Sequence, residues 1–189
     1  MGIFSRPGFP QGSASRTLPP RFLPGTRLGT PSGPRSIDSL VVGDPVSTRD
    51  GPKSITQISV DVLPRAAAAV RRETWPIRVP VGSLGNPAPL RLRADQRVVL
   101  EGKQVLAVCG VPRVSVAVGD LMGLRGLMSE RPTADLRWFG LTFDAPALVR
   151  VEGALCEIED GAAAVAARDL VREAFQAMHA VGEPPLVDF

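Results

Sequence analysis

Few side chains in this sequence have the chemistry of a nucleophile or of an acid–base catalyst at neutral pH. Its 189 residues include two cysteines, Cys109 and Cys156, one histidine, His179, and no tyrosine. Each cysteine follows apolar neighbours, which favours a buried structural thiol with a raised pKa over a nucleophile. A single histidine in a predicted C-terminal helix supports neither a zinc site nor a Ser-His-Asp triad. We therefore do not expect the common forms of thiol, serine or zinc catalysis.

The aspartates and the glycine pattern give no sign of a metal or nucleotide site. No Gly-x-Ser-x-Gly motif, phosphate-binding glycine loop or Cys-x-x-Cys pair is present. Four aspartates stand at predicted turns, where such side chains accept hydrogen bonds from local amides: Asp38, Asp44, Asp50 and Asp61. Their spacing matches no metal-binding motif, so we expect neither a metal ion nor a cofactor.

The first 35 residues differ from the rest in charge and composition. They contain five arginines, no acidic residue, and 13 of the chain's 38 glycines and prolines. Residues 1–20 are therefore predicted to form a disordered basic arm. Such an arm could bind an acidic surface, such as nucleic acid or lipid headgroups, but the chain lacks interleaved aromatic and basic residues. We expect no nucleic-acid partner and leave a protein partner open.

Few targeting features are present. The longest apolar runs fall short of 18 residues, which predicts no membrane span, and residues 1–10 lack the apolar stretch of a secretory signal. Two cysteines are too few for a disulfide framework. These features favour the cytoplasm, with signal-less export as the alternative. The preference for arginine (20) over lysine (2) suits a GC-rich bacterial genome.

Residues 21–158 consist of many short β-type runs separated by turn residues. Asp50-Gly51 is a turn signal, and Glu101-Gly102 and Glu152-Gly153 are predicted hairpin turns. Strands this short, at this spacing, predict an all-β sandwich or barrel. The segment Arg65–Arg72 is one or two helical turns or a loop. The predicted strands are Arg27–Thr30, Pro45–Arg49, Ser54–Val62, Trp75–Val79, Leu90–Arg93, Arg97–Leu100, Gln104–Val108, Arg113–Val118, Leu136–Phe143, Ala147–Val151 and Ala154–Ile158.

A change of hydrophobic period predicts one α-helix within residues 159–182, followed by a tail at 183–189. Asp160 is a candidate N-cap, and Gly182 with the prolines after it ends the helix. The apolar residues at helical spacing are Val165, Leu170, Val171, Phe175 and Met178. This stripe predicts packing against the β body, and binding to a partner is the alternative interpretation.

Four segments follow one another in a specific order. The first holds Phe22, Pro24-Gly25-Thr26, Thr30-Pro31, Gly33, Ile37, Leu40, Gly43-Asp44 and Val46, and the others are Pro76–Gly85, Leu90–Leu100 and Trp138–Gly153. In order and spacing they resemble the Hint domain, the hedgehog/intein autoprocessing module, in its bacterial branch, over residues 21–158. The resemblance implies an all-β, pseudo-two-fold body of many short strands.

The resemblance also implies a self-cleaving site, whose residues are replaced in this chain. Hint domains transfer the upstream peptide bond to a Cys or Ser side chain at their first residue, and this position is Arg21. A Thr or Ser and, three residues later, a His assist that transfer, and those positions hold Arg93 and Gln96. A later His position holds Gly140, and Asp144 is the ionisable residue that remains.

We therefore expect a degenerate Hint-like domain that acts as a structural or interaction module. The alternative is an active autoproteolytic domain that uses non-standard residues for an N-to-S or N-to-O acyl shift. Ser15 and Thr17 are hydroxyls upstream of Arg21, and no base is near them in sequence. Cleavage before Arg21 would release a 20-residue peptide, which is too short for a folded cargo.

Overall fold

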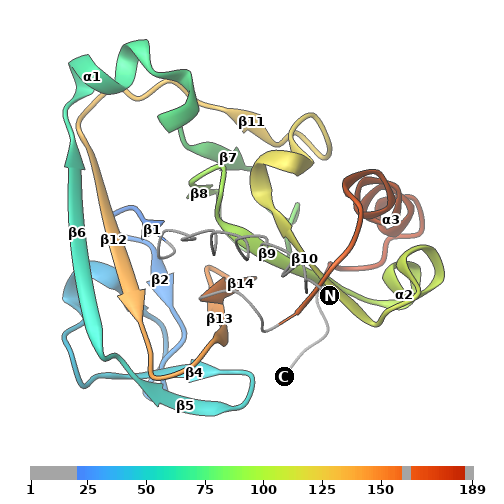
Figure 1. Cartoon of the computed structure of the whole chain (residues 1–189), viewed down its shortest axis with the longest axis horizontal. Coiled ribbons are helices and arrows are strands. Elements are labelled where there is room, and N and C mark those ends of the chain that lie inside the picture. The colour runs from blue at the N-terminus through green and yellow to red at the C-terminus, as the bar shows by residue number, and fades with distance from the viewer. Residues whose placement is uncertain (1–20, 159–162, 186–189) are drawn as a thin grey trace, which may run out of the picture.

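The computed structural model describes residues 21–158 and 163–185, so the arm predicted at 1–20 lies outside the described residues. Two β-sheets, one of six strands and one of nine, make up most of the molecule (Figure 1). A helix lies near the C-terminal end of the described chain. The predicted fold class, all-β with a C-terminal α-helix, is therefore confirmed, with two further short helices added.

The six-stranded sheet places a very short strand between partners that come from much later in the sequence. In spatial order its strands are β11 (Met128–Ser129), β7 (Ile77–Val79), β8 (Leu90–Leu92), β1 (Arg21–Phe22), β12 (Leu136–Thr142) and β6 (Gln57–Leu63). All neighbouring pairs are antiparallel. β6 and β12 are the longest, with seven residues each, and lie at the left of the molecule in Figure 1.

The nine-stranded sheet contains the strands that the sequence predicts best. Its strands are β15 (Ala164–Val165), β10 (Arg113–Ala117), β9 (Arg97–Glu101), β14 (Ala154–Ile158), β13 (Ala147–Val151), β2 (Arg27–Leu28) and β3 (Arg35–Ser36), with β4 (Pro45–Thr48) on β13 and β5 (Gly51–Ser54) on β4. The bounds of β13 and β14 match the prediction. Glu152 and Gly153 both have positive φ, as the predicted tight hairpin turn requires.

Helices cover the ends of the two sheets. They are α1 (Arg65–Val70), α2 (Lys103–Cys109) and α3 (Arg168–Ala180), with short 3-10 turns η1 (Ile37–Ser39), η2 (Arg72–Thr74) and η3 (Val118–Leu121). α3 lies against α2, β10 and η3 (Figure 1). It buries Val171, Ala174, Phe175 and Met178, so the predicted packing of this helix against the β body is confirmed.

One hydrophobic core joins both sheets and α3. Phe22 of β1 and Phe139 of β12 belong to it, together with Val149 of β13, Cys156 of β14 and Phe175 of α3. All five are buried, and burial of a large apolar side chain contributes about 1.5–3 kcal/mol. The core thus fixes β1 within the six-stranded sheet.

The predicted strand Gln104–Val108 is wrong, because this segment forms α2. The Glu183 carboxylate, from the chain after α3, accepts hydrogen bonds from the amides of Lys103 and Gln104 at 2.6 and 3.1 Å. A carboxylate at the first turn caps the free amides and suits the helix dipole. The predicted hairpin at Glu101-Gly102 is also wrong, since β9 pairs with β10 across the inserted helix.

The C-terminal helix begins later than the sequence suggests. The proposed N-cap Asp160 lies outside the described residues, and the helix begins at Arg168. Val165 belongs to β15, which pairs with β10, and its side chain is 72 % exposed. Leu170 is on the helix but is also exposed, so neither residue is part of the buried stripe.

Three smaller predictions are wrong, and one open segment is settled. The predicted strand Ser54–Val62 is divided, because β5 ends at Ser54 and β6 begins at Gln57, with buried Ile55 in the break between them. Asp61 lies inside β6 and not at a turn. Cys109 is the last residue of α2, so it does not follow a strand. The open segment Arg65–Arg72 forms α1 and the start of η2.

Candidate functional site

The backbone brings three of the five candidate positions together. In β1, Arg21 pairs with Gly140 of β12, and Phe22 pairs with Leu92 of β8. The antiparallel register then places Arg21 level with Arg93, the residue directly after β8. Positions 21, 93 and 140 therefore meet at one level of the six-stranded sheet, although they are far apart in sequence.

The first turn after β1 is held by local hydrogen bonds. The Thr26 amide donates to the Leu23 carbonyl at 3.2 Å, and Gly25 has a φ of +81°, a left-handed conformation that favours glycine. The Asp38 carboxylate accepts hydrogen bonds from the Gly25 amide, at 2.9 Å, and from the Ser36 hydroxyl. These hydrogen bonds lower the pKa of Asp38, the Ser36 hydroxyl having the largest effect.

The turn after β8 holds Arg93 against a neighbouring carboxylate. Its Nε and Nη2 donate to the two carboxylate oxygens of Asp95 at 2.9 and 2.6 Å. Gly119 donates its amide to the Ala94 carbonyl at 2.8 Å, and a Cβ at Gly119 would lie only 2.9 Å from that oxygen. The close approach of η3 thus fixes the turn, and Arg93 is committed to an ion pair with Asp95.

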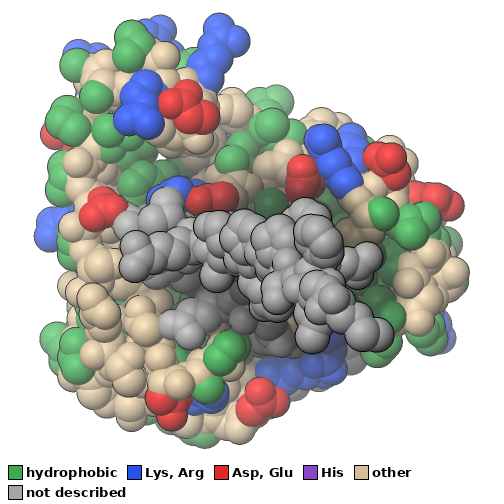
Figure 2. Space-filling view, viewed as in Figure 1, with side chains coloured by type: hydrophobic (Ala, Val, Ile, Leu, Met, Phe, Trp, Pro, Cys, Tyr) green, Lys and Arg blue, Asp and Glu red, His purple; other side chains and the backbone are tan. Residues whose placement is uncertain are grey.

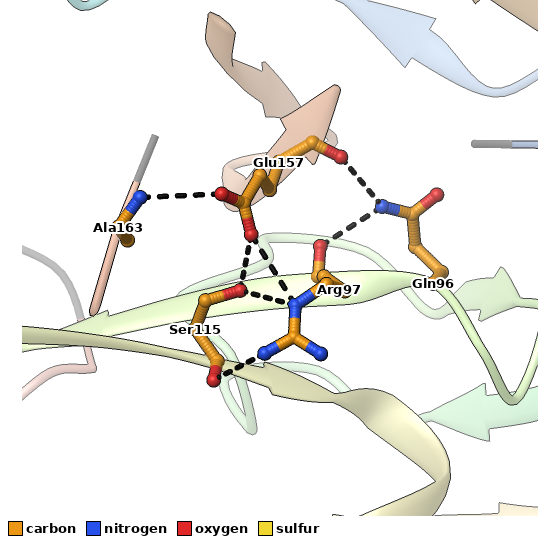
Figure 3. Close-up of polar contacts among 5 residues, drawn as sticks. All are labelled: Gln96, Arg97, Ser115, Glu157 and Ala163. Atoms are coloured by element: carbon orange, nitrogen blue, oxygen red, sulfur yellow. Dashed lines mark hydrogen bonds and ion pairs between the residues drawn. The ribbon is translucent and has the colours of Figure 1, made fainter. Parts of the chain in front are cut away.

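Gln96 is buried and joins two strands of the nine-stranded sheet. Only 3 % of the residue is exposed. Its side-chain amide donates to the carbonyls of Arg97, at 2.9 Å, and Glu157, at 3.1 Å (Figure 3). Its Oε1 atom has no hydrogen-bond partner among residues 21–158 and 163–185. At the position where the resemblance implies a histidine, this chain therefore has a buried amide that holds two strands together.

Next to Gln96 lies a buried polar cluster that the sequence analysis did not single out. Glu157 of β14 accepts hydrogen bonds from the Ser115 hydroxyl and from the Ala163 amide, and forms an ion pair with Arg97 at 3.3 Å (Figure 3). Glu157 and Ser115 are 3 % and 1 % exposed. The available signal was a glutamate within the apolar strand Ala154–Ile158, since a buried carboxylate needs partners.

A cleft of about 570 Å³ borders one of the candidate positions, Arg93. It lies between β6, the η2 segment and the turn after β8, and its lining includes Asp61, Arg71, Glu73, Arg93 and Trp138. Trp138 and Gly140 are two residues apart in β12 and so face the same side of the sheet, but only Trp138 lines the cleft. Figure 2 shows Lys and Arg side chains gathered over the α1 end, above this region.

Asp144 is not part of this group. It follows β12 at the end near β4 and β5, and its side chain is 78 % exposed. Its carboxylate is 4.0 Å from the ammonium of Lys53 in β5. The one ionisable residue that the sequence left as a candidate is therefore a surface carboxylate beside a lysine.

A family model and a solved structure place this fold among known proteins. Residues 20–159 match the model described as "Hint domain". This chain belongs to the Hint domain family. The same match covers β1, the turn after β8 and β12, so the three positions that meet in the sheet lie within the matched region. No curated protein matches the chain.

Solved structures with this fold are remote in sequence. A bacterial intein-like domain from Clostridium thermocellum is 13 % identical, with a TM-score of 0.51, over 74 % of this chain and 98 % of that one. The MchDnaB-1 intein is 15 % identical, with a TM-score of 0.43, over 73 % and 99 % of the two chains. At such identities the first of these likenesses shows the fold of this Hint domain, and nothing about its chemistry.

Both cysteine thiols of this Hint domain have raised pKa values. Burial raises the pKa of the Cys156 thiol, and burial together with Glu173 raises that of Cys109. Within residues 21–158 and 163–185, no three His, Cys, Asp or Glu side chains gather as a metal site would require. In the same residues no helix is long and apolar enough to cross a membrane.

Proposed function

We propose that this Hint domain does not cleave itself and acts as a structural or interaction module. The observation that carries the proposal is the set of residues at the three positions of the family's chemistry. Arg21 offers no thiol or hydroxyl, Arg93 no hydroxyl, and Gln96 no imidazole. An acyl shift needs a nucleophile to attack the carbonyl and an acid to protonate the departing amine.

The contacts of two of these residues support the same proposal. Arg93 is neutralised by Asp95 in a two-bond ion pair. Gln96 uses both N–H groups of its side chain to join β9 to β14. Residues at former catalytic positions thus stabilise the scaffold, which favours a domain retained for its shape and surface.

The second candidate function is self-cleavage before Arg21 with non-standard residues. This reaction would need Asp144, the ionisable residue that remains of those the family resemblance implies. Asp144 lies apart from positions 21, 93 and 140 and contacts Lys53. This placement favours a domain that does not cleave itself.

Intact-mass spectrometry of the purified chain tests this choice. We expect the mass to remain at 20.0 kDa after prolonged incubation with a thiol or with hydroxylamine. The proposal that the domain does not cleave itself would be contradicted if the wild type lost residues 1–20. In that case the loss should stop in Asp144→Ala and continue in the exposed control Asp50→Ala.

We also propose the cytoplasm as the compartment of this chain. The two cysteines are free, and free thiols persist in reducing compartments. Cell fractionation with an antibody to the chain tests this, and recovery from the medium of intact cells would contradict it.

A further inference from the structure

β6 has an edge that no described strand covers. Its seven residues all pair with β12, from Gln57 opposite Thr142 to Leu63 opposite Leu136. Among residues 21–158 and 163–185, no second strand pairs with β6, which ends the six-stranded sheet. Figure 1 shows β6 at the outer margin of the molecule. An unpaired strand edge presents a row of amides and carbonyls to any extended chain.

Apart from the charge of Asp61, this edge lacks the features that usually prevent pairing with another chain. β6 contains no lysine, arginine or proline, and Val60 and Val62 are 43 % and 58 % exposed. The other end strands of the described sheets are different. β5 has four residues with Pro52 and Lys53, and β3, β11 and β15 have two residues each. Long, unprotected edges are thus confined to β6 within the described chain.

We propose that β6 is a self-association edge, where it pairs antiparallel with β6 of a second copy about a two-fold axis at Val60. In this register Val60 lies opposite Val60 of the second copy, and Val62 opposite Ile58. Asp61, the single charged residue of β6, lies opposite Ser59. All seven residues find a partner, and the two six-stranded sheets become one continuous sheet.

The neighbouring symmetric registers are less favourable. An axis at Asp61 places two carboxylates directly opposite each other, which is destabilising. It also reduces the paired residues to the five from Ser59 to Leu63. An axis at Ser59 pairs only the five residues from Gln57 to Asp61. Charge and length therefore favour the axis at Val60, and a second copy is the occupant that this self-complementary strand fits.

The association is expected to be weak, because two paired strands form an interface at the small end of the known range. It does not depend on whether the domain cleaves itself, so failure of either proposal leaves the other in place. Sedimentation equilibrium on the full chain, up to several hundred micromolar, measures the association. We expect a mass that rises with concentration towards twice the 20.0 kDa of the chain.

A lysine in place of Val60, the residue at the proposed two-fold axis, tests the interface directly. Val60→Lys places two ammonium groups opposite each other and should weaken the association at least about tenfold. Val42→Lys, at a loop position that is 60 % exposed, is the control and should leave it unchanged. A wild-type mass of 20.0 kDa at every concentration, or a Val60→Lys variant that associates as the wild type does, overturns the proposal.

Disulfide cross-linking tests the register without adding charge. Opposite Cα atoms in antiparallel strands are about 4.5–5.5 Å apart, within disulfide reach. In a Cys109→Ser background, Val60→Cys should therefore form a covalent dimer on mild oxidation. Val62→Cys should not form a covalent dimer. In this register position 62 lies opposite position 58 of the second copy, so the two cysteines are four residues, about 14 Å, apart along the strand. Equal cross-linking of both variants, or none at Val60→Cys, overturns the register and the proposal.

Discussion

The two sheets of this Hint domain carry their charged residues differently. In the six-stranded sheet, ion pairs lie at the surface, such as Arg91–Glu130, whose side chains are 46 % and 36 % exposed. The nine-stranded sheet also has surface pairs, such as Lys53–Asp144, but it alone holds pairs with a buried carboxylate among the described residues: Glu157 with Arg97 and Glu101 with Arg49, whose glutamate side chains are 2 % and 6 % exposed. The first sheet holds the cleft and the open strand edge, and the second stabilises the fold.

The two candidate positions Arg93 and Gln96 lie in different sheets. Arg93 follows β8 of the six-stranded sheet and makes an exposed pair with Asp95. Gln96, three residues later, precedes β9 and is buried in the nine-stranded sheet. The comparison teaches that these two residues have different structural roles: Arg93 forms an ion pair near the surface, and Gln96 is part of a buried hydrogen-bond network.

The largest effect is expected from Glu157→Gln. The substitution removes the charge of the buried Glu157 carboxylate from its ion pair with Arg97, which should lower the free energy of unfolding by about 3–5 kcal/mol. Glu130→Gln, which breaks the exposed pair with Arg91, should cost less than about 1 kcal/mol. Urea denaturation of both variants measures the difference. Equal losses would mean that the two sheets do not differ as described.

Gln96→Ala comes next in size. It removes two hydrogen bonds, leaves the carbonyls of Arg97 and Glu157 without these donors, and should cost about 2–3 kcal/mol. Arg93→Ala removes an exposed ion pair and should cost less than about 1 kcal/mol. Thermal or urea unfolding compares the two variants. A larger loss for Arg93→Ala would reverse the assignment of surface and structural roles.

A smaller loss is expected from Gly119→Ala. The new Cβ would lie 2.9 Å from the Ala94 carbonyl oxygen, so the turn after β8 must shift at a cost of about 1–2 kcal/mol. Gly29→Ala is the control, because its Cβ would meet Ser47 and Arg150 at ordinary distances of 3.8 and 3.9 Å. Unfolding midpoints test the pair. Matching midpoints would show that η3 does not hold this turn.

The smallest effect is the acid dependence of the first turn. Because the folded pKa of Asp38 lies below its usual value of 3.8, this group adds stability above that pH. The contribution is lost as the pH falls through the folded pKa. Asp38→Asn should therefore be less stable than the wild type at about pH 6, and the gap should close as the pH falls below 3.8 and through the folded pKa of Asp38. A gap that is constant with pH would rule out the carboxylate's role.

The sequence predicts the fold well where the signal is local. The strands Ala147–Val151 and Ala154–Ile158 are delimited by the Glu152-Gly153 turn between them, and the structure has the same bounds. The prediction from sequence fails where a residue far away in the chain determines the local structure. α2 is capped by Glu183, 80 positions from Lys103, and nothing in the local pattern of the helix signals that carboxylate.

The candidate site is predictable only in part, for a similar reason. The order of motifs in the chain allows the positions of Arg21, Arg93 and Gly140 to be anticipated, and the strand register brings them to one level. The surroundings of Asp144 and Gln96 depend on side-chain contacts with other strands. Only the structure shows that the first lies beside Lys53 and that the second is buried against Glu157.

The central claim is that the Hint scaffold is retained while its chemistry is replaced. Intact mass of the wild type and of the triple variant Arg21→Cys, Arg93→Thr, Gln96→His, incubated side by side with a thiol, tests it directly. We predict that the wild type stays at 20.0 kDa and that the folded triple variant loses residues 1–20. Cleavage of the wild type, or a folded triple variant that stays intact, would contradict the account.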